Sequence, residues 1–143
     1  MKYKRQKETT DFSIIADAVC EYFEVNDKID IFKQTRKREV ITQRQWFHYF
    51  ARLLNPEHII SYSSIGAYYS DLTGHAFDHA TVLHSVIKIK GFLDVSKHDA
   101  LIKSEILYII KRRLDINFKP PLIGNCITQP FSIKKYSELK ING

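Results

Sequence analysis

Cysteine is scarce in this 143-residue chain, which contains only Cys20 and Cys126. The two lie far apart and lack the spacing of metal-binding cysteines, so the sequence offers neither a disulfide framework nor a thiolate zinc site. No apolar run is long enough to cross a membrane, and the basic start MKYKRQKETTDF is not followed by the apolar run of a secretory signal. We therefore expect a protein of the reducing cytoplasm with no membrane partner.

The usual signs of an enzyme are also missing. Neither cysteine has a histidine beside it, no serine lies in a nucleophile elbow, and no GxxxxGK[ST] loop is present to bind a nucleotide. His75, His79 and His84 with Asp78 invite a metal site, but Gly74 makes a shared helix face for the first two doubtful. We expect no enzymatic activity, no metal and no nucleotide cofactor.

Positive charge is in excess, with 22 Lys and Arg against 16 Asp and Glu, a net charge of +6 and a pI near 9.3. Residues 33–44, KQTRKREVITQR, hold five of the basic residues against the single acid Glu39. Charge alone favours a solvated turn between helices at this place, although a basic excess also suits a polyanionic partner.

Apolar residues recur at helical spacing in residues 11–24, 40–54, 78–93 and 96–114, and shorter helices are expected at 28–32 and 63–70. Asp99 follows Ser96 as in a capping box, and Gly74 indicates a turn in 71–77. Three of the four prolines follow Asp115, where no period persists. The sequence predicts an all-α domain of about six helices at 11–114, between a basic arm at 1–10 and an extended tail at 115–143.

The stretch FDHATVLH, residues 77–84, opens the helix expected at 78–93. On a helical projection the two faces differ sharply. One face is an apolar stripe of Val82, Val86, Ile89 and Leu93, widened by Leu83 and Ile87, and the other carries Thr81, His84, Ser85 and Lys88. A short helix precedes it across a turn, which is the arrangement of a helix-turn-helix whose second helix enters the major groove of DNA.

The first side chains of this helix have the chemistry for base recognition. Asp78 can accept from cytosine, His79 can donate to guanine or thymine, and Thr81 can place its hydroxyl or methyl group on a base. Lys88 can reach a phosphate, and the small Ala80 and Ser85 allow close approach. An alternative interpretation is that Asp78 only caps the helix and the polar face is solvated.

The run from Ile65-Gly66 through DHATVLHSVIKI resembles the signature of the carboxy-terminal DNA-binding domain of the bacterial replication initiator DnaA. Upstream, RKREVITQRQWFHYFARLL is similar to the basic loop and long helix of that family, with its Arg44-Gln45 pair, and EYFEV is similar to the end of its first helix. The resemblance covers roughly residues 12–114.

This resemblance implies a Trp-repressor-like helix-turn-helix that binds double-stranded DNA. It implies that Asp78, His79 and Thr81 read bases in the major groove, with Ala80 keeping an apolar contact where the family has Thr or Ser. Arg38 would enter the adjacent minor groove, and Arg36 and Lys37 would contact phosphates. Lys88 is a weaker candidate, and Arg44 is open between a DNA contact and a structural ion pair.

The chain departs from the family in two ways. Its turn SDLTGHAF is longer, and Phe77 stands where the family has a basic residue that touches phosphate. The ATPase module of the initiator is missing, so we expect a stand-alone DNA reader in replication or transcription control.

A helical adaptor is the alternative function. Such a protein would bind a protein partner through exposed aromatics, for which Trp46, Tyr49, Tyr68 and Tyr69 are the candidates, although we expect most of them to pack in the core. Its binding would depend little on salt, whereas DNA binding would depend on it strongly.

Overall fold

The computed structural model describes residues 9–115, which form seven α-helices and no strand. The helices are α1 (Phe12–Phe23), α2 (Ile29–Phe32), α3 (Arg38–Leu53), α4 (Tyr62–Gly66), α5 (Ser70–Thr73), α6 (His79–Val95) and α7 (Lys97–Leu114). The predicted all-α class is confirmed. Most of the predicted basic arm and all but the first residue of the predicted tail lie outside the described residues.

Three helices begin at side-chain caps that the sequence supplies. Ser61 Oγ accepts the backbone N–H of Ser64 at 3.1 Å, and Asp78 Oδ1 accepts that of Thr81 at 2.9 Å. Ser96 Oγ accepts the N–H of Asp99 at 3.2 Å, as the capping box predicted. The start of α6 is therefore fixed at His79, directly after its Asp78 cap.

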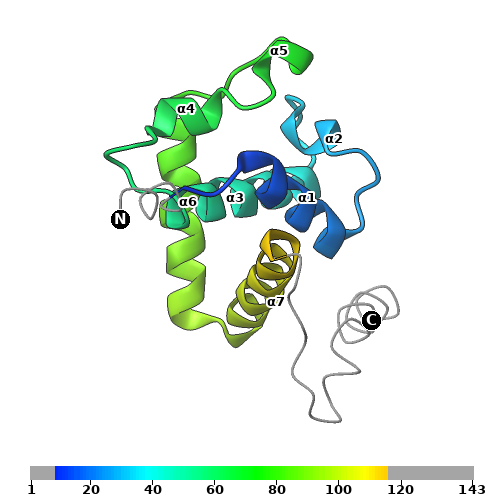
Figure 1. Ribbon diagram of the computed structural model, residues 1–143, viewed down its shortest axis with the longest axis vertical. Helices are drawn as coiled ribbons and strands as arrows, with labels where there is room; N and C mark the ends of the chain where they lie inside the picture. Colours follow the sequence, from blue (N-terminus) through cyan, green and yellow to red (C-terminus); the bar gives the residue numbers. More distant parts are fainter. Residues whose placement is uncertain (1–8, 116–143) are drawn as a thin grey trace.

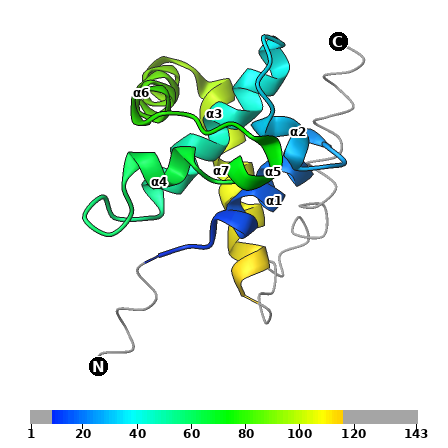
Figure 2. The same ribbon diagram turned by 90° about the horizontal axis from the view of Figure 1, so that it is seen from above.

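The long helix α6 lies across α3 and begins beneath α4, while α7 turns back to pack against α1 (Figures 1 and 2). An aromatic cluster joins the other elements, with ring centroids 4.8–6.0 Å apart among Phe12, Phe32, Phe47, Tyr68 and Tyr69. At the opposite side, Glu21 of α1 binds both Arg112 and Arg113 of α7. These contacts tie α1 to α2, α3 and α7, while α3, α4 and α6 pack directly against one another.

Two boundaries differ from the sequence prediction. The basic segment, residues 33–38, is irregular over residues 33–37, and α3 begins at Arg38 rather than at Val40. The helix expected at 63–70 is split into α4 and α5 because Tyr69, with φ +70°, turns the chain between them. Gly74 ends α5 in the left-handed conformation, as its turn role predicted.

The faces of α6 are rotated from the prediction. Ser85, expected on the polar face, is only 3% exposed, whereas Leu83 and Ile87, expected to widen the apolar stripe, are 40% and 58% exposed. The reason is that α3 and α4 both pack on the side of Val82, Val86 and Ser85. None of the described helices has the length and apolar character to span a membrane.

Candidate nucleic-acid interface

The first turn of α6 presents its side chains to solvent. His79, Ala80 and Thr81 are exposed, and so is Asp78 before them. Hydrogen bonds from the Thr81 backbone and side chain lower the pKa of the Asp78 carboxyl below its usual value, so the group is ionised at neutral pH. The four residues therefore offer a carboxylate, an imidazole, a methyl group and a hydroxyl at one helix tip.

A close backbone contact sets the position of this tip. Phe77 N–H donates to the carbonyl of Gly66, the last residue of α4, at 2.9 Å. A Cβ atom at position 66 would lie 1.9 Å from the Phe77 carbonyl oxygen, a distance that no side chain tolerates. Glycine is therefore required for α4 to reach the residue that directly precedes Asp78.

A buried polar pair fixes the underside of the same turn. The Ser85 hydroxyl donates to the Thr81 carbonyl at 3.1 Å, and it lies 3.0 Å from Nδ1 of His48 on α3. Since the hydroxyl proton goes to Thr81, neutral His48 donates its Nδ1–H to Ser85. Burial, with a smaller effect of the nearby Arg44 charge, lowers the pKa of His48 to about 3.

The basic segment leads into the exposed start of α3. Arg36, Lys37 and Arg38 are all exposed. Lys37 is the N-cap residue and makes no side-chain cap, while Arg38 is the first helical residue rather than part of a loop. Cations are unfavourable at the positive end of a helix dipole, so the bare N–H groups and the added charges together favour an anion here.

Arg44 does not reach the surface with these residues. It is 7% exposed, and its Nη1 donates to the carbonyl oxygens of Ile31 at 3.2 Å and Lys33 at 3.0 Å. Its guanidinium carbon lies 4.2 Å from the centroid of the Phe77 ring. The structural partners are thus two carbonyls and an aromatic ring, not the carboxylate that an ion pair requires.

The longer turn before α6 contains α5, which packs on α2. The centroid of the Tyr69 ring lies 5.1 Å from that of Phe32, and Lys28 Nζ lies 5.9 Å from the Tyr69 centroid. Thr73 Oγ1 donates within the turn and accepts the N–H of His75 at 3.2 Å. The inserted residues therefore form an ordered turn supported by α2, the helix that precedes the basic segment.

Further along α6, the outward face includes His84, Ile87 and Lys88, all exposed. Lys88 Nζ lies 6.0 Å from the Phe92 ring on the next turn. Sequence reasoning missed the supporting role of His48, and it gave Gly66 only as part of the resembled signature, without its contact with Phe77. The Ile-Gly pair was a signal for the second, but a histidine in a mostly apolar helix gives no sign of a serine partner 37 residues away.

The aromatic residues proposed for an adaptor surface are largely in the core. Trp46 and Tyr49 are 1% and 3% exposed, and Tyr68 and Tyr69 are half-buried within the aromatic cluster. The expectation of core packing is confirmed for the first two. An exposed aromatic surface built on Trp46 and Tyr49 is therefore wrong.

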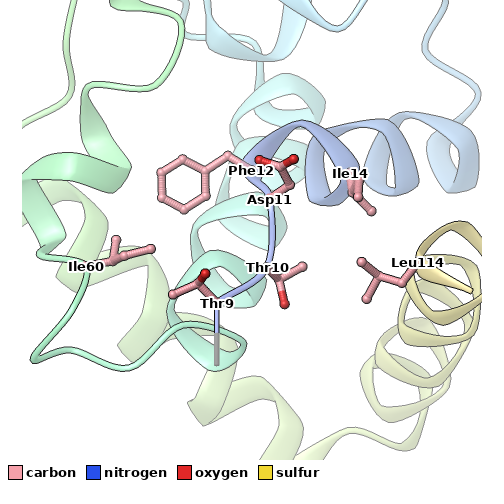
Figure 3. A pocket seen from close by; sticks show the side chains of 7 residues that line it. All are labelled: Thr9, Thr10, Asp11, Phe12, Ile14, Ile60 and Leu114. Atoms are coloured by element: carbon pink, nitrogen blue, oxygen red, sulfur yellow. The ribbon is translucent and has the colours of Figure 1, made fainter. Parts of the chain in front are cut away.

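Among residues 9–115 no group of three or more potential metal ligands is clustered. A pocket of about 480 Å³ lies at the start of α1, where Ile14 and Leu114 point toward one another and Ile60 lines the far side (Figure 3). Its remaining lining is Thr9, Thr10, Asp11 and Phe12. It shares no residue with the start of α6 or with the basic segment.

Residues 12–89 match the family described as the bacterial DnaA protein helix-turn-helix. Chromosomal replication initiator protein DnaA of Bacteroides thetaiotaomicron is 33% identical over 99 residues, which cover 69% of this chain and 19% of the relative. The chain thus spans about a fifth of the length of that relative. No solved structure matches the chain significantly.

Proposed function

Because this chain belongs to the DnaA helix-turn-helix family of DNA-binding domains, we propose that it recognises a preferred sequence in double-stranded DNA through two adjacent grooves. The start of α6 enters the major groove and the basic segment lies along the minor groove and phosphates. The relative from B. thetaiotaomicron is named as a chromosomal replication initiator, and the proposed role is control of replication or transcription.

The exposed start of α6 supports base reading most directly. Asp78, His79, Ala80 and Thr81 are exposed while the opposite face of the same helix is packed on α3 and α4. In a helix-turn-helix, the recognition helix has one face packed on the domain and an exposed amino-terminal turn, whose side chains contact base edges. Asp78 accepts from cytosine, His79 donates to guanine or thymine, and Thr81 and Ala80 contact a thymine methyl group.

The exposed cations at the start of α3 support the second half of the proposal. Arg38 enters a narrow A·T-rich minor groove, where the negative potential is strongest, and Arg36 and Lys37 neutralise phosphates. Lys88, two turns further along α6, reaches a flanking phosphate. The asymmetry of the two elements favours one site bound by one molecule.

Selection of bound duplexes from a random-sequence library at moderate salt tests this function. The expected result is an enriched motif that combines a few fixed base pairs with a neighbouring A·T-rich step. Binding with no enrichment that disappears as salt rises would contradict it, and would leave a basic helical protein whose specific partner is another protein.

A further inference from the structure

Arg44 joins the two elements that the proposed function assigns to DNA. On one side it donates to the carbonyls of Ile31 and Lys33, where α2 ends and the basic segment begins. On the other side it lies over the ring of Phe77, the residue before Asp78. Only this side chain of α3 contacts both places among the interactions described above.

The contacts of Arg44 are costly to maintain. A buried guanidinium without a carboxylate beside it loses hydration, and two carbonyls and a ring face restore only part of that loss. An apolar side chain of similar length would fill the same space without the desolvation penalty. Arginine at this position is therefore better explained by the geometry it imposes than by a gain in stability.

We propose that Arg44 is a positioning residue that fixes the basic segment relative to the start of α6 and does not itself touch DNA. This inference rests on the proposed function: Arg44 would fix the relative position of the two elements that contact the major and minor grooves. When the guanidinium is removed, the carbonyls of Ile31 and Lys33 lose their shared donor and Phe77 loses the group that covers its ring. The basic segment and the start of α6 then no longer have a fixed position relative to one another.

The neighbouring Arg52 provides a matched control. It lies on α3 as well, its Nη2 donates to the carbonyls of Asn55 at 2.8 Å and Ile60 at 2.7 Å, and its guanidinium is 4.7 Å from the Tyr62 ring. Arg52→Met and Arg44→Met thus remove the same charge and the same kinds of contact. Of the two arginines, only Arg44 contacts Ile31 and Lys33 at the basic segment and Phe77 before α6.

The test measures the affinity of the full chain for its selected duplex and for a shuffled duplex, over a range of salt concentrations. Arg44→Met is expected to weaken binding to the selected duplex by about tenfold or more, and to change binding to the shuffled duplex by less than about twofold. Arg52→Met is expected to leave the ratio of the two affinities unchanged.

A double-mutant cycle with Arg38→Ala separates positioning from direct contact. If Arg44 places the basic segment, Arg38→Ala costs at least about threefold less affinity in the Arg44→Met background than in the wild type. If Arg44 instead contacts a phosphate, Arg44→Met weakens binding to both duplexes alike, lowers the salt slope by about one, and adds independently to Arg38→Ala. That second outcome would overturn the inference.

Should Arg44→Met fail to fold, Phe77→Leu serves in its place, because it removes the ring face and keeps apolar bulk. It carries no charge change, so a loss of sequence preference with an unchanged salt slope would support the inference. An unchanged preference would overturn it. A wild-type chain that shows no preference at all would instead contradict the proposed function.

Discussion

At the residue scale, His48 is held neutral beneath the first turn of α6. Its pKa of about 3 lies far below the 6.5 of a solvated histidine, chiefly because burial disfavours the charged ring. The unfolded chain therefore binds a proton below about pH 6.5 that the folded chain does not. Acid consequently favours the unfolded state.

The free energy of unfolding is expected to fall by about 1.6 kcal/mol between pH 6.5 and pH 5 through this residue alone, with a slope that approaches about 1.4 kcal/mol per pH unit at the acid end. In His48→Gln that part of the pH dependence is absent. Urea unfolding at several pH values measures it, and His58→Gln, at an exposed histidine of the α3–α4 loop, is the control. Parallel pH curves for wild type and His48→Gln would contradict the assignment.

His79→Ala tests base reading by one exposed side chain. Loss of its hydrogen bond is expected to cost about 1–3 kcal/mol on the selected duplex and little on shuffled DNA. Fluorescence anisotropy on both duplexes measures the difference, again with His58→Ala as the matched substitution. An equal loss on every sequence would show that position 79 does not read a base.

At the scale of elements, the contact between α4 and the turn before α6 sets the helix-turn-helix angle. Gly66→Ala forces the Phe77 carbonyl away and is expected to destabilise the fold by about 1–3 kcal/mol, with weaker sequence preference. Gly91→Ala is the control, because nothing lies within 4 Å of a Cβ added there and alanine favours the helix by up to about 1 kcal/mol. Chemical denaturation compares them. Equal stabilisation by both would contradict the close-contact interpretation.

The proposed contact of the basic segment with DNA predicts a salt-dependent effect of Arg38. Arg38→Ala is expected to weaken DNA binding and reduce the slope of log affinity against log salt by about one. Lys97→Ala, an exposed cation at the start of α7, removes the same charge away from this segment. Affinities of both variants are measured over a series of salt concentrations. Equal slopes of log affinity against log salt for the two variants would refute a specific role for Arg38.

Helical spacing was enough to predict α1, α3, α6 and α7, because each buries a stripe of its own residues. It could not predict that Ser85 turns inward, because a serine is buried only when a distant partner satisfies it, here His48 from α3. Likewise the sequence left Arg44 open between a DNA contact and a structural ion pair, because nothing in it indicates that Arg44 meets two backbone carbonyls and the Phe77 ring. The roles of the exposed site residues stay predictions.

At the scale of the whole molecule, α7 completes the core although it lies outside residues 12–89 that match the family. Its Ile102, Ile106, Ile109 and Ile110 are buried, and each contributes about 1.5–3 kcal/mol. Their sum is comparable with the full stability of a small domain.

A fragment of residues 9–95 is therefore expected to lack a cooperative thermal transition, because α1 loses its cover. Circular dichroism melting curves measure this, and a fragment of residues 9–115 is expected to melt cooperatively. A sharp transition for the shorter fragment would show that α7 is dispensable.

Thr9 and Leu114 line the same pocket, so the polypeptide enters and leaves this domain at one place (Figure 3). None of the residues proposed for DNA contact lies there. A short linker joining these two points, with new termini opened in the exposed loop around Glu57 and His58, would give a circular permutant with the same core. Such a protein could carry a fluorescent label or a second domain at either new end, and α6 would still pack on α3 and α4.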